Sequence, residues 1–363
     1  IVNLNQELMS DMATKRKSWK RRFRPGGCCA CLTGFTLLIA VACLMTFLYF
    51  DSKLSLLSNL VYVEFGNTNA NLEVRNAAGK WVRPDTLNSE AFENMLNKNV
   101  TIQGEGMRWR TFRLRRTADN RRERIINSIV GCETHVIEFD PEHFEFFPRF
   151  EIDKRKFEPQ THRKALQATR KGRLPRFVIN ANYYNRKGQP LGWIVKDGKT
   201  IRKQWKTWSG FFFVKDGIPR FGPRSLLESS KGELTHALQG YPSVMKDGTV
   251  GKYGENDHGD SFFNGSELNF RSLAGVNARG HCVFFVSGRG GLMNIEDVTQ
   301  IARLAGIRDA TLLDGGKALQ YGMGGKYGSA SFHSYNNELP EELFKGRLPP
   351  QQPPVFLVVR RKE

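Results

Sequence analysis

The chain has 363 residues, of which 40% are hydrophobic and 25% are charged. This balance excludes a disordered protein and allows one large or two modest domains. The formal net charge of +19 invites a nucleic-acid-binding interpretation. However, a basic block at residues 15–24 supplies a sizeable share of that charge, and no zinc-type spacing or known nucleic-acid module accompanies it. We therefore expect no nucleic-acid partner.

Residues 28–50 carry no charged side chain, and such a run can cross a hydrocarbon layer of about 30 Å as one helix. The basic block before it predicts a cytoplasmic N-terminus by the positive-inside rule. We therefore expect a basic cytoplasmic tail at 1–27, a single-pass transmembrane anchor at 28–50 and a main domain that is periplasmic or otherwise extracytoplasmic. The alternatives are a cleaved signal peptide, although no small-residue cleavage site follows Phe50, and lipidation at Cys43.

The part of the chain after this run is itself basic. Its cysteines, Cys132 and Cys282, could form one disulfide, which export would permit. A cluster of arginines could suit an anionic polymer or a membrane surface, or it could be a solvated face. The members of this cluster are Arg108, Arg110, Arg113, Arg115, Arg116, Arg121, Arg122 and Arg124.

Residues 51–125 mix short apolar runs with Asn, Gly and Arg, and we assign them to a stalk or small subdomain. The main domain is then 126–363. Its first part shows the periodicity of regular elements, with strands expected at 134–140 and 176–180 and a helix at 161–171. The second of these strands leads into the polar and aromatic sequence Asn180-Ala181-Asn182-Tyr183-Tyr184.

Lys-Asp-Gly occurs three times, at 196–198, 215–217 and 246–248, each time after an apolar stretch. Asp-Gly supplies the positive φ angles of tight turns, so each copy predicts a hairpin. Asn277-Ala278-Arg279-Gly280 predicts another. The fold class is therefore α+β, a mixed and largely antiparallel sheet with hairpins and a few packed helices. Few helices and many hairpins argue against a doubly wound sheet or a β/α barrel.

The last third of the chain contains an acidic residue directly after an apolar strand. Asn294 is a candidate N-cap with acids in the first turn that follows, and residues 310–313 predict a buried apolar strand. Asp314, Gly315 and Gly316 come next. An acid at the end of a strand, followed by glycines that let a ligand approach the backbone, is typical of an active site, although a plain Asp-Gly turn is the alternative. Residues 348–354 are a Pro-rich link, and 355–359 are a closing strand.

Several motifs in a fixed order resemble the phosphodiester glycosidase family, which includes bacterial exopolysaccharide-associated proteins. They are Ile179–Tyr184, Ala237–Pro242 leading to Asp247-Gly248, Arg271–Val276, Gly288-Arg289 with Gly291-Leu292, and Leu313–Gly316. The resemblance covers roughly residues 134–360. It implies a membrane-anchored, exported hydrolase that cleaves the C1–O bond of sugar-1-phosphodiesters in a glycan or glycolipid. Two departures are Lys317, where the family has small or hydroxyl residues, and Ala181 in a turn that resembles Asn-Gly-Gly.

The resemblance also suggests roles for individual residues. Because the leaving group is a stable phosphate anion, the site must mainly stabilise an oxocarbenium-like centre, hold phosphate and direct water or a carboxylate at C1. Asp314 is the candidate catalytic carboxylate, and Arg271 suits the phosphate because a guanidinium can bind two oxygens. Arg271 could instead pair structurally with an acid. The expected substrate-binding residues are Asn180, Asn182, Arg289, Gly315, Gly316 and Lys317.

The metal requirement stays open. The loop Glu255–Asp260 could bind a hard cation such as calcium, or it could be a solvated loop without ordered ligand spacing. Aromatic residues could stack on sugar rings or pack in the core; these are Tyr183, Tyr184, Trp193, Trp205 and Trp208. Two other functions compete with the hydrolase: a catalytically silent protein that binds anionic glycans or assists polysaccharide export, and a nuclease or phosphatase. The last is disfavoured because no two-metal carboxylate set is visible.

Overall fold

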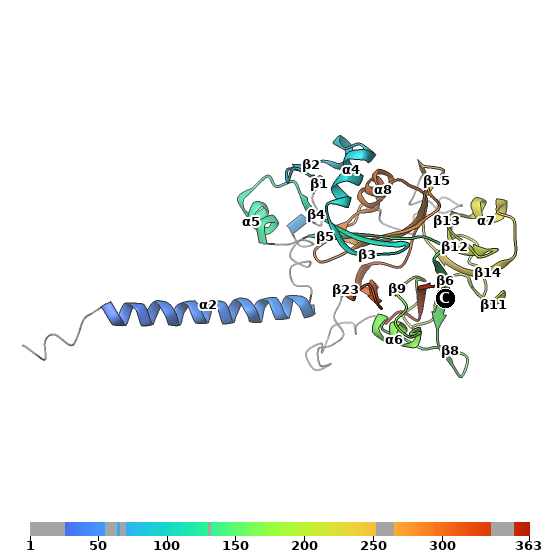
Figure 1. The fold of residues 1–363 in the computed structure, drawn as a ribbon, viewed down its shortest axis with the longest axis horizontal. Coiled ribbons are helices and arrows are strands. Elements are labelled where there is room, and N and C mark those ends of the chain that lie inside the picture. Colours follow the sequence, from blue (N-terminus) through green and yellow to red (C-terminus); the bar gives the residue numbers. More distant parts are fainter. Residues whose placement is uncertain (1–25, 55–63, 66–69, 130–131, 252–264, 335–351) are drawn as a thin grey trace, which may run out of the picture. The chain divides into compact units, whose positions relative to one another are not determined.

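The computed structural model describes residues 26–54, 64–65, 70–129, 132–251, 265–334 and 352–363 (Figure 1). The chain divides into two compact units, Ile1–Ser52 and Lys53–Glu363. The described part of the first unit belongs to helix α2 (Gly26–Leu54). This helix contains the whole uncharged run 28–50.

The transmembrane anchor predicted for that run is not found. Among the described residues, no helix is both long enough and apolar enough to cross a membrane. A helix does form at the predicted place, and the side chains described within it, at 33–47, are exposed. The basic tail before it lies outside the described residues.

The second unit is built on a ten-stranded sheet of order β16-β15-β21-β18-β19-β5-β4-β1-β2, with β3 paired to β4. Its strands are β1 (Leu72–Arg75), β2 (Trp81–Val82), β3 (Val100–Gly104), β4 (Met107–Arg116), β5 (Glu133–Phe139), β15 (Ser243–Lys246), β16 (Thr249–Val250), β18 (Ser272–Asn277), β19 (Cys282–Ser287) and β21 (Ile307–Leu312).

Two five-stranded sheets complete the core of the unit. The β9 sheet has the order β23-β22-β9-β24-β6, and the β14 sheet has the order β11-β10-β14-β12-β13. The strands of the β9 sheet are β6 (Phe144–Phe150), β9 (Arg176–Asn180), β22 (Gln320–Gly324), β23 (Ala330–His333) and β24 (Val355–Arg361). Those of the β14 sheet are β10 (Ile194–Lys196), β11 (Lys199–Arg202), β12 (Gly210–Lys215), β13 (Ile218–Pro223) and β14 (Leu234–Gly240).

Short strand pairs and helices surround these sheets. The two pairs are β7 (Ile152–Asp153) with β8 (Lys156–Phe157) and β17 (Asn269–Phe270) with β20 (Leu292–Met293). The helices are α4 (Ser89–Asn97), α5 (Arg121–Ile129), α6 (His162–Ala168), α7 (Arg224–Ser229) and α8 (Ile295–Leu304), with 3₁₀ turns η1 (Pro84–Thr86) and η2 (Gly316–Ala318). The predicted α+β class, with a largely antiparallel sheet, is confirmed.

The local turn chemistry explains the hairpins, and the predicted turns are confirmed. The three Lys-Asp-Gly copies connect β10 to β11, β12 to β13 and β15 to β16. In each copy both the Asp and the Gly have positive φ angles, from 48° to 76°. The predicted Asn277–Gly280 turn likewise connects β18 to β19.

Residues 72–116, which the sequence assigns to a stalk or small subdomain, are part of the largest sheet. β4 pairs with β5 over seven residue pairs, from Met107↔Phe139 to Arg113↔Glu133, and Figure 1 shows the two strands side by side. Salt bridges also cross this boundary: Arg116 contacts Asp297 of α8 at 2.6 Å. Sheet pairing therefore joins this segment directly to the region that follows.

Phenylalanine side chains hold the three sheets together. Phe284 of β19 is fully buried; its ring lies 5.2 Å from that of Phe177 in β9 and 5.7 Å from that of Phe221 in β13. Phe139 of β5 also contacts Phe177, at 5.6 Å between ring centroids. Burying large aromatic rings is among the strongest stabilising contributions available to a core. One continuous core thus fixes the ends of the three sheets relative to one another.

Cys132 and Cys282 are both buried and reduced, so the disulfide that they could form is absent. Burial raises the pKa of the Cys132 thiol to about 12, and it raises the pKa of Cys282 as well. Both thiols therefore stay protonated and behave as small apolar core residues.

Candidate active site

The three sheets meet at the residues that follow β9, β14 and β21. The backbone N–H of Asp314, just after β21, donates to the carbonyl of Ala181, just after β9, at 3.0 Å. Asn182 reaches the third sheet, because its Nδ2 lies 3.4 Å from the carbonyl oxygen of Gln239 in β14. Sequence motifs separated by more than a hundred residues are thereby brought together at one place.

Asp314 is a buried carboxyl group at this junction, with 7% of its surface exposed. Asn180 Nδ2 donates to the Asp314 main-chain oxygen at 3.0 Å and lies 3.3 Å from Oδ2. Burial raises the pKa of Asp314 to about 8, although hydrogen bonds from Asn180 and from the N–H of Gly315 act in the opposite direction. Desolvation disfavours the charged form, and a strongly shifted carboxyl at a junction of elements is typical of a functional site.

Asn180 is itself held firmly. Its Oδ1 accepts a 2.8 Å hydrogen bond from the backbone N–H of Gln320, at the start of β22. The Gln320 side chain in turn accepts from the backbone N–H of His162 at 3.1 Å. Because both ends of the Asn180 amide are engaged, its orientation toward Asp314 is fixed, as preorganised catalysis requires.

Asn182 carries a buried acceptor that none of the described residues satisfies. Its Nδ2 is surrounded by three carbonyl oxygens, those of Leu191 at 3.1 Å, Trp193 at 3.4 Å and Gln239 at 3.4 Å. This arrangement fixes the amide orientation. Its Oδ1 is buried and has no hydrogen-bond partner among the described residues. An unsatisfied buried acceptor is rare in native structures, and here it offers a binding position for a ligand donor such as a sugar hydroxyl.

The glycines after Asp314 allow the chain to turn tightly against a neighbouring strand. A Cβ at Gly315 would lie 2.5 Å from the carbonyl oxygen of Phe270 and 3.6 Å from the Cα of Arg271. Gly316 has a φ of +60°, which disfavours larger residues. The turn continues into η2, where the side chain of Lys317 is exposed. The glycines therefore set the path of the backbone beside the carboxyl.

Arg271 is buried at the same end of the ten-stranded sheet. Its Nε donates to the Met293 carbonyl at 3.0 Å and its Nη2 to the Glu267 carbonyl at 2.6 Å. Burial lowers its pKa, and its charge lowers the pKa of Tyr183, which places the two groups near one another. A guanidinium with such limited solvation would favour a nearby phosphate, although two of its donors already bind main-chain oxygens.

Arg289 and Lys317 are the other two basic residues predicted to bind the substrate. Arg289 lies in the turn after β19, at the same end of the sheet as Arg271, and its side chain is exposed. Its main-chain oxygen accepts from the N–H of Glu133 at 2.8 Å. The assignment of Arg289 and Lys317 to substrate binding stays a prediction.

Aromatic side chains form one wall beside Asn182 and Asp314. The rings of Trp205 and Trp208 are stacked at 5.0 Å, and Tyr183 meets Trp208 edge-on at 5.2 Å. Tyr183 donates its hydroxyl to the Tyr241 carbonyl at 2.7 Å, and its pKa is raised by burial and by Asp314. Trp205 is 41% exposed. Exposed stacked indoles beside polar groups suit the apolar faces of sugar rings.

Sequence reasoning did not identify the two glutamines that support the site. Gln239 is fully buried, and its side chain bonds the main chain of Trp193 and Trp205, thereby orienting the aromatic wall. Gln320 positions Asn180 as described above. Gln239 lies in the motif Ala237–Pro242, so the family resemblance could have identified it. Gln320 lies outside the motifs that carry the resemblance.

The described residues contain no cluster of three or more His, Cys, Asp or Glu side chains that could hold a metal ion. The loop Glu255–Asp260, in which the sequence allows a calcium site, lies outside the described residues. A metal site there stays a possibility raised by the sequence alone.

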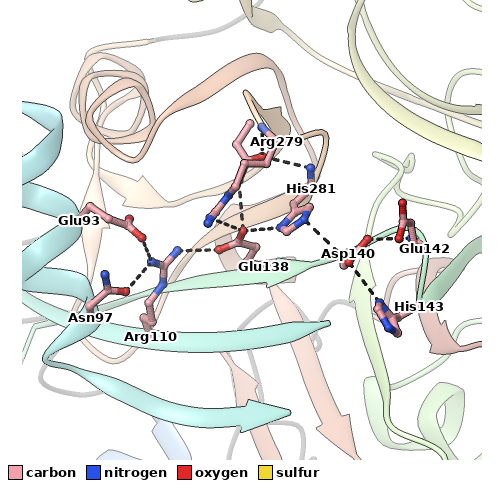
Figure 2. Close-up of polar contacts among 10 residues, drawn as sticks. Glu93, Asn97, Arg110, Glu138, Asp140, Glu142, His143, Arg279 and His281 are labelled. Atoms are coloured by element: carbon pink, nitrogen blue, oxygen red, sulfur yellow. Dashed lines mark hydrogen bonds and ion pairs between the residues drawn. The ribbon is translucent and has the colours of Figure 1, made fainter. Parts of the chain in front are cut away.

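A second buried polar cluster is centred on Glu138 of β5 (Figure 2). Its carboxylate receives Arg279 Nη2 and His281 Nδ1 at 2.7 Å each, and Arg110 Nη2 at 3.1 Å. Asn277 donates to it at 3.2 Å. These contacts lower the pKa of Glu138 despite its burial, which alone would raise it. Because its contacts come from several elements, this cluster connects β4, β5 and the β18–β19 turn.

Comparison with known proteins places a family match over the region that contains Asp314. The model of the phosphodiester glycosidase family matches residues 175–340, a range that contains every predicted site residue. No curated protein sequence matches the chain. Among solved structures, the zebrafish N-acetylglucosamine-1-phosphodiester alpha-N-acetylglucosaminidase catalytic domain, auto-inhibited by its pro-peptide, has a similar fold, with a TM-score of 0.50 and 14% identity over 72% of this chain and 85% of that chain.

Two bacterial structures are more distant. A hypothetical protein from Synechocystis has a TM-score of 0.44 and 12% identity, over 81% of this chain and 68% of that one. A putative exported protein from Burkholderia pseudomallei K96243 has a TM-score of 0.42 and 12% identity, over 63% of this chain and 74% of that one.

The family match excludes β5, β6 and β24, so it is narrower than the resemblance over 134–360. Residues 175–340 thus match the phosphodiester glycosidase family, which supports a hydrolase of the glycosidase type.

Proposed function

We propose that this hydrolase cleaves the C1–O bond of a sugar-1-phosphodiester carried by a glycan or glycolipid. The observation that carries the proposal is the Asp314 carboxyl, buried, held by Asn180 and shifted to a pKa of about 8. A carboxyl in this state, once deprotonated, is a strong base or nucleophile for its type, because low solvation leaves its charge poorly stabilised.

The other groups fit the demands of this substrate. Departure of a phosphate monoester anion needs little help from a general acid, so one carboxylate beside C1 is sufficient chemistry for the protein to supply. In the proposal, Arg271 holds the phosphate, Asn182 Oδ1 accepts a sugar hydroxyl, and the aromatic wall of Trp205 and Trp208 packs on the ring. Asn180 is the positioning residue for Asp314.

The test compares Asp314→Asn with wild type in the release of reducing sugar from N-acetylglucosamine-1-phosphodiesters and related sugar-1-phosphodiesters. Asn preserves size and hydrogen bonding but cannot serve as base or nucleophile, so we expect a loss of turnover of about 10³-fold. Asp309→Asn is the matched control, because Asp309 lies on β21, the strand that Asp314 follows, and accepts from the N–H of Asp247. Undiminished turnover in Asp314→Asn would refute the assignment.

Location is a separate proposal, supported by the sequence pattern alone. The basic block 15–24 followed by the uncharged run 28–50 favours export of the second unit with the N-terminus in the cytoplasm. The test expresses the full chain with a tag at its C-terminus and exposes intact cells or spheroplasts to protease. Loss of the tag signal without lysis supports export, and loss only after lysis contradicts it.

A further inference from the structure

A cavity of about 530 Å³ lies between the β1–β2 turn, the segment after α4 and the middle of β4. This volume is in the range of sites that hold small ligands or one segment of a polymer. Its lining among the described residues comes from 75–79, 98–101 and 111–113. All of these residues precede the family match at 175–340. In the ten-stranded sheet, β4 is separated from β21 by β5, β19 and β18, so the cavity is distinct from the site at Asp314.

The described lining of this cavity is positively charged. It contains Arg75, Lys98 and Arg113 and no acidic side chain. Lys98 is the C-cap of α4, where its charge also offsets the partial negative charge of the helix end. Arg75 and Arg113 therefore supply the net positive potential in the cavity.

These three cations are not used in ion pairs with any carboxylate of the described residues. That distinguishes them from five other arginines of the same region, which are paired: Arg83 with Asp85, Arg110 with Glu93 and Glu138, Arg115 with Glu73, Arg116 with Asp297, and Arg122 with Glu64. Arg75 is also oriented, since its Nε donates to the Gly79 carbonyl at 3.2 Å across the turn. Unneutralised cations around one cavity attract an anion.

The polar groups beside the cations favour a hydroxyl-bearing ligand. Asn76 uses its Oδ1 to accept from the N–H groups of Ala78 and Lys80, which leaves its Nδ2 as a donor. Asn99 uses its Nδ2 to donate to the Met95 carbonyl, which leaves its Oδ1 as an acceptor. Phe112, the aromatic residue of the described lining, is 2% exposed and offers no face on which a nucleobase could stack. An anionic glycan matches this set better than a nucleic acid.

We propose that the cavity lined by Arg75, Lys98 and Arg113 is an accessory binding site for an anionic glycan segment, one that carries carboxylate or phosphate groups. The site binds the polymer through its basic side chains, and it does not contribute to bond cleavage. Its existence does not depend on the proposed reaction at Asp314.

The experiment measures binding of the purified full chain to fluorescently labelled oligogalacturonate and poly(glycerol phosphate), by anisotropy at several salt concentrations. The test variant is Arg75→Gln/Lys98→Gln/Arg113→Gln. The matched control is Arg303→Gln/Arg308→Gln/Lys231→Gln, which removes the same number and kind of exposed cations from elsewhere in the second unit. We expect the test variant to lose about tenfold in affinity for at least one polymer and the control to keep wild-type affinity.

The pattern of results identifies the ligand. Preference for oligogalacturonate assigns the carboxylate, and preference for poly(glycerol phosphate) assigns the phosphate. Equal loss in both triple variants would show non-specific attraction to a basic protein and overturn the proposal. Wild-type binding to neither polymer, or equally tight binding to oligodeoxythymidylate, would overturn it too. Turnover of a small soluble sugar-1-phosphodiester should be unchanged in the test variant, so failure of this proposal is distinguishable from failure of the proposed reaction.

Discussion

In the proposed reaction the chemistry depends on Asp314, and the protonation state of its carboxyl group decides when the site is active. Because burial raises its pKa to about 8, the carboxyl is protonated at neutral pH in the free enzyme. If the carboxylate is the reactive form, kcat/KM should rise with pH and level off above about pH 8. A pH–rate profile measured on a soluble sugar-1-phosphodiester checks this. A profile that falls across pH 7–9 would instead assign Asp314 as a proton donor.

The same shift predicts a conflict between activity and stability at this residue. The folded-state pKa lies above the ordinary value of 3.8. Below about pH 4 the carboxyl is protonated in both the folded and unfolded states and does not lower the free energy of unfolding, which then falls as pH rises toward 8. Asp314→Asn removes that penalty and should raise the free energy of unfolding at pH 7 by a few kcal/mol, at most about 4. Urea unfolding at several pH values measures it. A gain that does not shrink as pH is lowered toward 4 would contradict the buried-carboxyl explanation.

At the residue scale, the sequence pointed to Asp314 as a candidate but did not show which residues would contact it. Asp314 was predictable because an acid and two glycines follow an apolar strand. The pairing of Asp314 with Asn180 spans 134 residues of sequence, and the bond from Gln320 to Asn180 spans 140. Such contacts form only when β9, β21 and β22 come together in the fold. The local sequence pattern therefore could not show which amide side chain contacts which carboxyl group.

The turn after β21 is the element that places the carboxyl. Gly315→Ala would put a Cβ 2.5 Å from the Phe270 carbonyl oxygen, which belongs to a neighbouring backbone that cannot move freely. We expect a destabilisation of about 1–3 kcal/mol and a fall in kcat larger than any change in KM, because Asp314 moves with the turn. Gly251→Ala is the control, since its nearest contact would be an ordinary 3.7 Å. Equal effects of the two substitutions on kcat would show that the turn does not position Asp314.

At the element scale, sequence succeeded where structure depends on adjacent residues. The Lys-Asp-Gly hairpins form as predicted because Asp-Gly provides the required φ angles locally. Helix α8 also begins as predicted, with a capping box in which Asn294 accepts from Asp297 N–H and Asp297 accepts from Asn294 N–H. Short strands such as β17 and β20 were missed, since two residues carry too little periodicity to be recognised.

The Glu138 cluster holds the early strands of the second unit to the rest. Glu138→Gln keeps the shape of the side chain but leaves Arg110, which is 2% exposed, without one of its two carboxylate partners. We expect a loss of about 3–5 kcal/mol in the free energy of unfolding, the usual cost of breaking a buried pair. Glu105→Gln, whose side chain is 64% exposed, should cost less than about 1 kcal/mol. Comparable losses in the two variants would contradict a structural role for the cluster.

At the scale of the whole molecule, sequence predicted the class of fold but not its connections. The alternation of strands and tight turns was sufficient to predict an antiparallel α+β fold. The sequence analysis placed a domain boundary at residue 125, between β4 and β5, yet these strands pair with each other. The pairing was hard to predict because α5, and not a hairpin turn, joins the two strands. The meeting of three sheets around Phe284 also depends on packing between distant segments.

The central claim is that the enzyme breaks the bond between the anomeric carbon and oxygen. The most direct measurement runs the reaction with N-acetylglucosamine-1-phosphodiesters in ¹⁸O-labelled water and analyses both products by mass spectrometry. Cleavage of the C1–O bond places the label on C1 of the released sugar and leaves the phosphate unlabelled, which is the predicted result. Label in the phosphate would show attack at phosphorus, and it would contradict a glycosidase mechanism at Asp314.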